Sequence, residues 1–549
     1  MKKLLLTIAA AWMAAGLVMG GGIVTNTNQS ASWVRMPVRD ASRDIDAVFY
    51  NPAGLFKLKD GFHFSINNQY VTQKQEVQNF YKGPGDLFGL NQSLYKGTVL
   101  APVFPGIYGV FKKGNLAISF GVNPIGGGGG AEFKTGLPSF EMPVSDLVPG
   151  LGAQGYKLDT YFKGSSIYMG YQLGVSYKLS DMIQVYLGAR YVTVKNTYSG
   201  YLKNIQVNMA GTWTPAPTVF NDLANYATLG ADGAKKIAST MGTLISNTIP
   251  STYTLDQVVG LNGTFNATDR ANIIQGLTAI GLAADSTLGI GDIQANTTAA
   301  ATSFTNSAAT ATATAMLVSD QTADVTQTGS GITPIVGVNL TFGDKLNVGI
   351  KYEFATKMEV TNKTKQDVLV GFNGATPVTM FPDGAKTKND MPAFLSVGAE
   401  YALTDKITLD LGTHYYFDRS VNYGKKVNSL AVDNKAVIDK NYLELAGGLQ
   451  FKVNDKILVS AGYLNTQSGV NKDYQSDLSY SLSTNTFGFG GQYSFSENLK
   501  LNVGYAYTAY KKADLTYEHS LTGVPQPISY NETFWKNTQI IAVGLDISF

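Results

Sequence analysis

Segments in which apolar and polar residues strictly alternate recur along the chain, and this period of two predicts β-strands. In the final segment, 541–549, every odd-numbered position from Ile541 to Phe549 is apolar, whereas the even-numbered positions are small or polar. The segments on both sides of the turn at Thr404–Lys406 alternate in the same way. A soluble β-sandwich would alternate too, but it would rarely combine strands this long with turns that are short only at alternate connections.

Six pairs of such strands are joined by short turns of Asp, Asn, Ser, Gly or Lys, which are residue types that favour chain reversal. One strand near Phe62–Val71 precedes these pairs, and one from Lys536 to Phe549 follows them, which gives fourteen strands. Short turns at one end and long loops at the other are typical of outer-membrane barrels. The sequence therefore predicts an all-β fold, a closed transmembrane antiparallel β-barrel. The short turns lie near Gly114, Asp181, Asp344, Asp405, Asp455 and Asn498.

The first twenty residues differ from the rest and predict a secretory signal peptide, 1–20. Lys2 and Lys3 form a positive start, Leu4–Ala15 is apolar, and Val18 and Gly20 are small enough for a cleavage site. Without Lys2 and Lys3, the 42 basic residues become 40, against 40 acidic residues, so the charge balance gives no sign of nucleic-acid binding. The chain has no cysteine, and no later run of 18 apolar residues predicts a membrane helix.

Three stretches do not follow the hairpin pattern, and we expect them to carry function. The first, 21–59, is polar and precedes the first strand; it contains several charged residues and the sequence FYNPAGL from Phe49. It is either a disordered leader or an ordered hatch that plugs the lumen. The remainder, 60–549, is assigned to the barrel.

The second stretch lies at the outer end of the third strand. Proline removes a donor from the sheet ladder, and consecutive glycines remove all side chains, so the wall is expected to bend or part there, toward the outer leaflet. An ordinary glycine-rich extracellular loop is the alternative. The residues are Asn123, Pro124, Gly126, Gly127, Gly128, Gly129 and Gly130.

The third stretch is a long extracellular insertion, 201–331, between the fifth and sixth strands. Apolar residues at helical spacing follow Thr268, which we expect to cap a helix, and 295–315 is rich in alanine and threonine. The helices either cradle a hydrophobic ligand or pack only on one another.

Together, the plug-like leader, the Asn51-Pro52-Ala53 triplet ahead of strand one, the interrupted third strand and the helical third loop resemble the FadL/TodX family. This is a family of outer-membrane transporters for long-chain fatty acids and other hydrophobic compounds. The resemblance covers the chain after the signal peptide. It implies multi-pass insertion in the bacterial outer membrane, in contact with its lipid, and it implies that Phe549 is the signal read by the barrel-assembly machinery.

The resemblance also implies a mechanism, in which a hydrophobic molecule is captured in an extracellular apolar groove and leaves sideways through the kinked third strand. On this analogy the glycine-rich stretch is the lateral gate. The hatch and substrate-binding residues would be Ile23, Phe49, Tyr50, Asn51, Pro52 and Ala53.

Two other functions stay open at this point, a general hydrophilic porin and a surface receptor or adhesin. By strand parity several charged residues face the lumen, where they either line an aqueous channel or form a polar network that holds the plug. An enzyme is not expected, because the three histidines, His63, His414 and His519, lack metal-ligand spacing and there is no cysteine. No cofactor, metal or nucleotide-binding loop is expected, so transport should be passive. The lumen-facing set is Arg190, Lys351, Glu353, Glu400, Asp410, His414 and Glu444.

Overall fold

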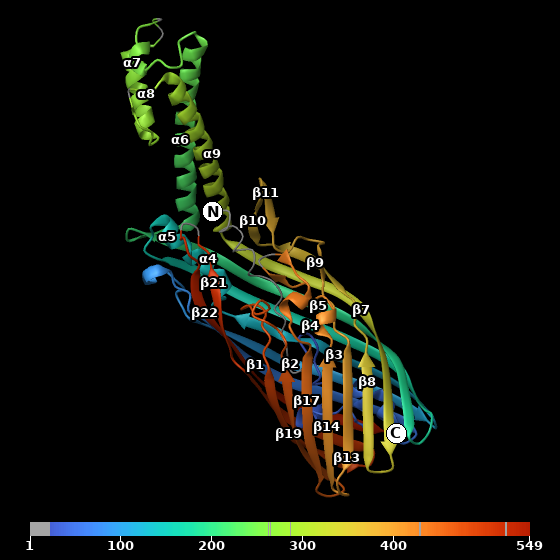
Figure 1. Ribbon diagram of the computed structural model, residues 1–549. Helices are drawn as coiled ribbons and strands as arrows, with labels where there is room; N and C mark the ends of the chain where they lie inside the picture. The colour runs from blue at the N-terminus through green and yellow to red at the C-terminus, as the bar shows by residue number, and fades with distance from the viewer. Residues whose placement is uncertain (1–21, 262, 264, 286, 428–429, 522–523) are drawn as a thin grey trace.

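The computed structural model describes residues 22–549, apart from 262, 264, 286, 428–429 and 522–523; the expected signal peptide lies outside the described residues. Fourteen antiparallel strands close into a barrel (Figure 1), and three of them are each broken into two pieces. The strands are β1 Gly61–Asn79, β2 Leu94–Lys113, β3 Leu116–Phe133, β4 Tyr156–Lys178, β5 Ile183–Met209, β7 Gln321–Phe342, β8 Leu346–Glu353 with β9 Glu359–Gln366, β12 Lys386–Lys388 with β13 Phe394–Ala402, β14 Ile407–Tyr416, β17 Tyr442–Lys452, β18 Ile457–Gln467, β19 Thr484–Ser496, β20 Leu499–Tyr510 with β21 Ala513–His519, and β22 Ile528–Ser548.

The first and last strands pair along most of their length, from His63 opposite Ser548 to Asn79 opposite Glu532, which closes the sheet. The predicted fourteen-strand barrel and its six short turns are therefore confirmed. Closure leaves no open strand edge, which lipid could not satisfy with hydrogen bonds. On β14, for example, Leu411 is half exposed on the outer face, whereas Asp410 and His414 are buried inside.

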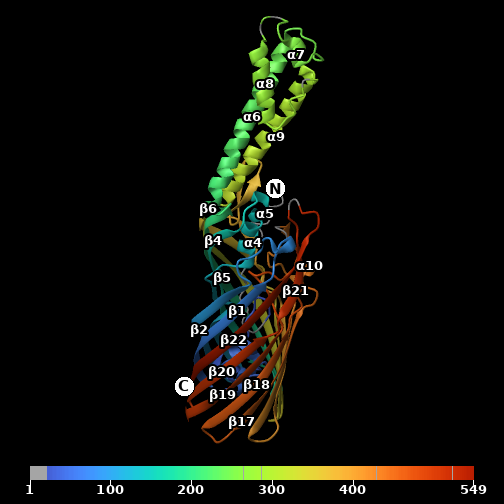
Figure 2. The same cartoon turned by 90° about the vertical axis from the view of Figure 1, so that its left-hand side faces the viewer.

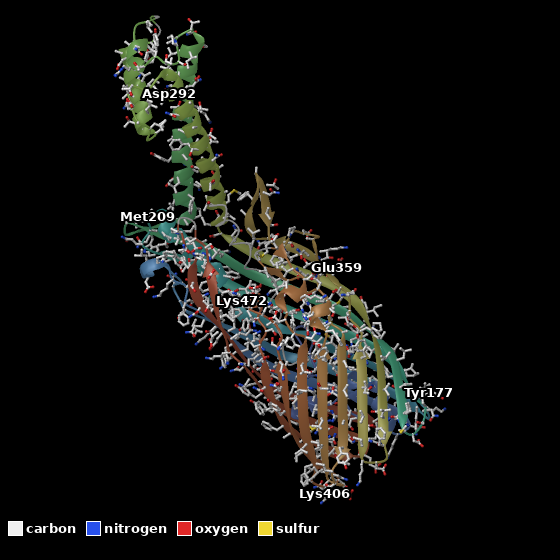
Figure 3. The ribbon with its side chains drawn as sticks, viewed as in Figure 1. Tyr177, Met209, Asp292, Glu359, Lys406 and Lys472 are labelled. Carbon is white, nitrogen blue, oxygen red and sulfur yellow. The ribbon has the colours of Figure 1, made fainter. Side chains whose placement is uncertain are left out.

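The two ends of the barrel differ. Figure 3 places Lys406 in a short turn at one end and Lys472 in a long loop at the other. By the usual rule these are the periplasmic and the extracellular ends. A membrane crossing needs about 10 residues per strand, yet β4 has 23 residues and β5 has 27. The wall therefore rises beyond the membrane on the β4–β5 side, above the shorter β8 and β13.

Residues 22–59 fill the lumen as a plug. The plug contains α2 Ala31–Arg35, α3 Ala47–Tyr50 and the 3-10 helix η2 Pro52–Lys57, and nearly all of its side chains are buried. Its backbone approaches the wall at glycines: an added Cβ on Gly488 would lie 2.6 Å from the Val34 carbonyl oxygen. Since such a distance is too short for two non-bonded atoms, the inner face needs glycine there to admit the plug.

The extracellular excursion between β5 and β7 is a long helical stalk with a small head (Figure 2). Helix α6 Ala216–Ser246 runs out along α9 Ile290–Leu317, and small side chains such as Ala227, Ala231 and Ala234 are buried in this helix pair. The head adds α7 Leu255–Val258 and α8 Ala267–Ala279, and Figure 3 places Asp292 there. Among the described residues, no helix combines the length and apolar character needed to cross a membrane.

Two expectations about this excursion need correction. Residues 201 and 331 lie inside paired strands, because β5 and β7 pair up to Leu202 opposite Gln321, so the excursion spans 210–320. The cap of α8 is Asn266, whose side chain accepts hydrogen bonds from the backbone amides of Thr268 and Asp269, and not Thr268 itself. The head has its own core, in which Ile237, Met241, Leu244, Ile273 and Leu277 pack on one another.

Smaller elements crowd the extracellular mouth and cover the upper lumen. The strand β6 Thr212–Pro215 turns back and pairs antiparallel with the end of β5, and the remaining elements belong to loops between the strands. They are η3 Pro84–Asp86, α4 Pro138–Ser145, α5 Leu147–Leu151, β10 Leu369–Asn373, β11 Thr376–Thr379, η4 Asp418–Ser420, β15 Lys426–Val427, β16 Leu430–Ala431 and α10 Asn434–Val437.

Because the head packs on itself, the barrel should fold without it. Replacing residues 223–312 with a short Gly-Ser linker keeps the base of the stalk, where Phe220 and Ala315 pack against the barrel loops. We expect the barrel to retain its heat-dependent shift in gel mobility and its β-type circular dichroism. A chain that no longer forms a barrel would contradict the independence of the head.

Candidate functional site

Strand β3 is irregular where the sequence predicts it. Its register against β4 shifts by one residue between Pro124 and Gly126, and again between Gly127 and Gly129, so Ile125 and Gly128 are extra residues in two β-bulges. Gly127 has φ +72°, a backbone conformation that favours glycine. Bulges bend a strand, and β3 turns inward here.

The irregular part of β3 has lost one of its two neighbours. Against β2, pairing runs up to Val122 and resumes at Ala131, whereas pairing with β4 continues through most of the same stretch. On the β2 side, residues 100–106 do not pair with β3. The register between β2 and β1 is also irregular there, because Pro102 and Val103 have no partner on β1. The wall therefore parts between β2 and β3. It does so within the strand and not at its outer end, since β3 continues to Phe133.

A plug segment, Thr25–Gln29, lies in this gap, and we name it the latch. Thr25 forms a β-bridge with Gly126. The Asn26 backbone amide donates to the Ile125 carbonyl at 2.8 Å, and the Gln29 side-chain amide donates to the Pro124 carbonyl at 2.9 Å. The latch thus takes over hydrogen bonds that β2 would make in a regular sheet.

Further contacts fix the latch to the plug and to β2. The Tyr50 hydroxyl accepts from the Gln29 backbone amide at 3.0 Å and donates to the Thr27 carbonyl at 2.8 Å. The Tyr108 hydroxyl of β2 donates to the Gln29 carbonyl at 2.7 Å. The Asn123 side chain donates to the Gln29 side-chain oxygen at 2.6 Å. The Asn28 side chain also donates to the Gln69 side-chain oxygen of β1 at 2.9 Å. Displacing the latch therefore means breaking several hydrogen bonds, all of them between neutral groups.

Behind the latch is a small lumen pocket of about 20 Å³, large enough for about one water molecule. Two cations in its neighbourhood share one carboxylate: Arg190 and Lys351 both pair with Glu353, at 2.5 and 2.7 Å. The ring of Phe49 lies against both cations, 5.1 Å from the Arg190 guanidinium carbon and 4.8 Å from the Lys351 nitrogen. The lining includes Thr25, Asn26, Thr27, Phe49, Ile125, Arg190, Thr333, Glu353, Thr356, Met391, Pro392, Phe394 and Tyr416.

The residues of the FYNPA motif divide between two places. Phe49 lines the lumen pocket and Tyr50 holds the latch, as described above. Asn51, Pro52 and Ala53 lie against β4, β5 and β7: Asn51 donates to the Val338 carbonyl, the Pro52 carbonyl accepts from Ser176, and Ala53 packs with Tyr186 and Ile335. The triplet therefore anchors the base of the plug, apart from the gap.

Ile23 lies near the start of the described chain, in an apolar cluster at the top of the lumen. It is buried with Phe394, Tyr416, Tyr442 and Tyr474. Since Phe394 and Tyr416 also line the lumen pocket, this cluster covers the pocket on its extracellular side.

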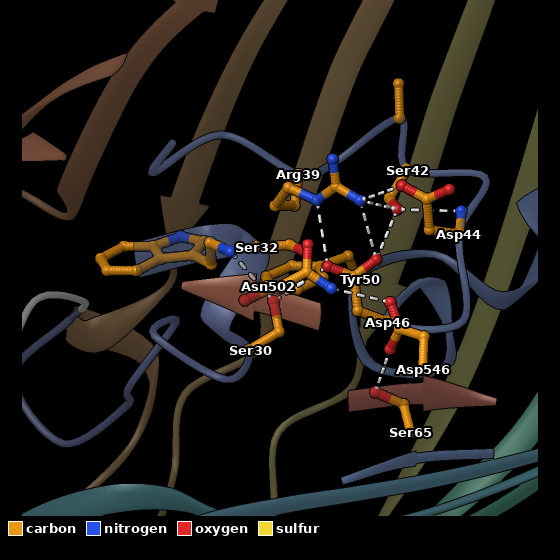
Figure 4. A network of polar contacts seen from close by, with 12 residues as sticks. Ser30, Ser32, Arg39, Ser42, Asp44, Asp46, Tyr50, Ser65, Asn502 and Asp546 are labelled. Atoms are coloured by element: carbon orange, nitrogen blue, oxygen red, sulfur yellow. Dashed lines mark hydrogen bonds and ion pairs between the residues drawn. The ribbon is translucent and has the colours of Figure 1, made fainter. Parts of the chain in front are cut away.

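The centre of the plug is a charged network (Figure 4). The Asp46 carboxylate accepts hydrogen bonds from Arg39, Ser30 and Ser42, at 2.6 to 3.0 Å. A second chain of contacts ties the plug to the wall: Ser32 donates to Asn502, Asn502 to Asp546, and Ser65 to Asp546. These buried charges and amides are thus largely satisfied by the plug and the wall together.

The remaining lumen-facing residues also bind the plug. His414 lies between Asp40 of the plug and Glu444 of β17, and Arg43 of the plug pairs with Glu400. This arrangement favours the polar network that holds the plug over an aqueous channel. The other two histidines lie elsewhere, with His63 bonded to Ser548 and His519 paired with Asp146 at 2.8 Å.

Sequence reasoning missed the latch. The segment Thr25–Gln29 has no helix or strand periodicity, and its amide side chains read as a polar leader. The only available signal was the presence of Asn26 and Gln29, whose side chains can replace a missing strand as donors. The interruption between β8 and β9, at 354–358 and beside Met391 and Pro392, was also missed.

Removing the charge of Arg39 should loosen the plug. Arg39→Met leaves the buried Asp46 carboxylate without its counter-ion, a change that costs about 3–5 kcal/mol in comparable buried pairs. We expect a correctly assembled barrel with higher ion conductance in planar bilayers than the parent protein. Lys59→Met is the matched control, because the Lys59–Glu497 pair is exposed. Equal conductance of the Arg39 variant and the parent would show that this network does not hold the plug.

Comparisons with known proteins agree with this architecture. Outer membrane protein P1 of Haemophilus influenzae is 25% identical over 218 residues, which are 37% of this chain and 46% of that protein, so the match spans about half of the relative's length. The crystal structure of a Pseudomonas aeruginosa FadL homologue superposes with a TM-score of 0.54 and 13% identity, covering 98% of this chain and 100% of that one. This second likeness concerns the fold alone.

The family model for outer membrane protein transport proteins (OMPP1/FadL/TodX) matches residues 259–549, which is more than half of the chain. Its members are outer-membrane transporters of hydrophobic compounds. With its closed fourteen-strand barrel and its N-terminal plug, this protein belongs to the OMPP1/FadL/TodX family and resides in the outer membrane.

Proposed function

We propose that this protein takes up long-chain fatty acids or similar hydrophobic small molecules, and that it releases them sideways through the gap between β2 and β3. The observation that carries the proposal is the missing β2–β3 pairing over Asn123–Gly130, with the latch in its place. A permanent wall would pair these strands. A wall that is completed by a separate segment opens when that segment moves.

The chemistry of the cargo supports a sideways exit. Each buried methylene group gains about 0.8 kcal/mol from leaving water. A hydrocarbon chain released into the periplasm would lose that free energy again, whereas a chain released through the wall passes directly into lipid. Transport then runs down the concentration gradient and needs no coupled energy source.

The path that we propose begins at the extracellular loops and leads through the Ile23 cluster to the lumen pocket. The pocket is nearly closed, so a cargo molecule must displace part of its lining. Because the latch contributes Thr25, Asn26 and Thr27 to that lining, cargo in the pocket competes for the same space as the latch. Loading the pocket would then favour opening of the gap.

The proposal for Phe549 is separate. Its side chain is 77% exposed, while its backbone amide donates to the Phe62 carbonyl at 2.8 Å. An exposed aromatic ring at the end of the closing strand fits a role as the residue that the barrel-assembly machinery reads.

Deleting the two bulge residues tests the exit. Removing Ile125 and Gly128 together lets β3 pair regularly with β4 and straightens the strand that bends inward. We expect uptake of a radiolabelled long-chain fatty acid to fall close to the level of cells lacking the protein. The measurement is uptake by intact cells, with the amount of folded barrel confirmed by heat-dependent gel mobility.

Deletion of Gly374, in the exposed β10–β11 turn, is the control for shortening the chain, and it should leave uptake unchanged. If the double deletion gives a folded barrel that still transports at the parental rate, the exit does not run past the bend of β3.

A further inference from the structure

The outer face of β5, β7, β9 and β12 carries a row of residues with a lysine at each end. Lys195 of β5 pairs with Thr328 of β7. Thr328 pairs in turn with Thr361 of β9, and Thr361 pairs with Lys386 of β12. Since neighbouring strands lie about 4.8 Å apart, the Cα atoms of the two lysines are about 14 Å apart.

A third lysine lies in the next row of the same face. Lys363 of β9 pairs with Thr326 of β7, and Thr326 pairs with Thr197 of β5. Lys363 is two positions from Thr361 on β9, so both side chains point outward, and Lys363 lies between the two ends of the first row. We call these three lysines, with the four threonines between them, the lysine belt.

The ammonium groups of the lysine belt are exposed and unpaired. Lys195, Lys363 and Lys386 are all exposed, and within the described part of the chain none of them forms an ion pair with a carboxylate. Asp383, in the turn before β12, is the nearby carboxylate that also lacks an ion pair there; it accepts from the Thr364 backbone amide at 2.9 Å. Three unpaired cations therefore stand against one unpaired anion.

The other carboxylates next to the lysine belt already have lysine partners. Asp324, above the belt on β7, pairs with Lys365 at 3.2 Å. Glu359, below the belt on β9, pairs with Lys388 at 2.8 Å and is attracted at longer range by Lys386. These neutral pairs border the belt and leave its excess positive charge in place.

The height of the lysine belt places it just above the membrane. Lys195 is twelve positions above the start of β5, which is ~29 Å at about 3.4 Å per residue and a tilt of about 45°, whereas the apolar band is ~25 Å tall. Ile167, opposite Lys195 on β4, and Ile332 on β7 are exposed and mark the upper edge of the apolar surface. Figure 3 shows Glu359, next to the belt, nearer the extracellular end than Tyr177.

We propose that the lysine belt binds the phosphate groups of lipopolysaccharide, the glycolipid of the outer leaflet, while the acyl chains of the lipid lie against the apolar surface below. The lysine ammonium group is a compact cation that binds phosphate, and the threonine hydroxyls between the lysines can donate further hydrogen bonds. The phosphates of this lipid lie at the boundary between its acyl chains and its sugars. An apolar surface that leads directly into unpaired cations fits such a lipid better than a soluble anion.

The location of the lysine belt suits a structural lipid site and not a station on the uptake path. The strands β3 and β4 separate it from the gap between β2 and β3. A bound glycolipid would hold the barrel at one height in the membrane, on the side where the wall is tall, and would leave the gap unobstructed. The inference uses only the residence of the protein in the outer membrane and is independent of the cargo.

Binding of two forms of one lipid tests the proposal. The probes are lipid A, the phosphorylated anchor of lipopolysaccharide, and the same lipid after its phosphates have been removed. Affinities are measured by microscale thermophoresis with the full protein in detergent micelles, with EDTA present to remove bridging cations. The parent protein should prefer the phosphorylated form.

The combined variant Lys195→Gln, Lys363→Gln and Lys386→Gln should bind lipid A about a hundredfold more weakly, since each lysine near an anionic lipid surface contributes about fivefold. Its affinity for the dephosphorylated lipid should equal that of the parent. Replacing the same three lysines with arginine should preserve lipid A binding. Heat-dependent gel mobility confirms that each variant forms the barrel.

The matched control removes three exposed lysines from the short turns at the periplasmic end, Lys345→Gln, Lys406→Gln and Lys456→Gln, and should leave both affinities unchanged. Equal binding of the two lipids by the parent, or equal binding of lipid A by the parent and the belt variant, would overturn the proposal. It would also be overturned if a short DNA duplex bound as tightly as lipid A, or if millimolar inorganic phosphate displaced the lipid, because the belt would then be a general anion surface.

Discussion

The structure depends on the rule that backbone polar groups within a membrane-spanning wall need partners. A continuous barrel meets this rule by pairing every strand with two neighbours. Here β3 parts from β2 over eight residues, and the carbonyls of Pro124 and Ile125 bond to the latch. The plug is therefore part of the wall as well as a stopper in the lumen. Any movement of its first residues changes the sheet itself.

The same requirement governs the charges inside the barrel. Asp40 and Arg43 of the plug are matched by His414 and Glu400 of the wall, whereas Asp46 is matched by Arg39 within the plug itself. Such pairs fix the plug in one place, because each charge that leaves its partner remains in a region with little water.

Local patterns were enough to predict the barrel. The turn at Thr404–Lys406 and the alternation on both sides of it are encoded within about twenty residues, and the odd-even pattern of 541–549 orients the closing strand. The irregularity of β3 was also predictable from local sequence, because a proline followed by several glycines disturbs the pairing of any strand. Which charged residues face the lumen was predicted from their odd or even positions along the strands alone.

What the sequence did not predict depends on contacts between distant segments. Nothing in Asn123–Gly130 indicates that the lost partner is β2 and not β4, because either neighbour fits the same residues. The role of Gln29 depends on its distance from Pro124, 95 positions along the chain. Lys425 lies in a polar loop, where a lysine is normally solvated, and only the structure shows that it is buried.

The two ways through this barrel differ in their physical cost. Straight passage to the periplasm requires the plug to give up its charged partners on the wall, as in the pairs Asp40–His414 and Arg43–Glu400, and breaking one such buried pair costs about 3–5 kcal/mol. Sideways passage requires the latch to release several hydrogen bonds between neutral groups, among them those of Asn26, Asn28 and Gln29, each worth about 1 kcal/mol. A hydrophobic cargo offers no charge to replace the lost partners in the plug, but it can fill the volume that the latch vacates. The difference between charged and neutral contacts therefore supports a lateral route, with the plug body fixed and only its first residues moving.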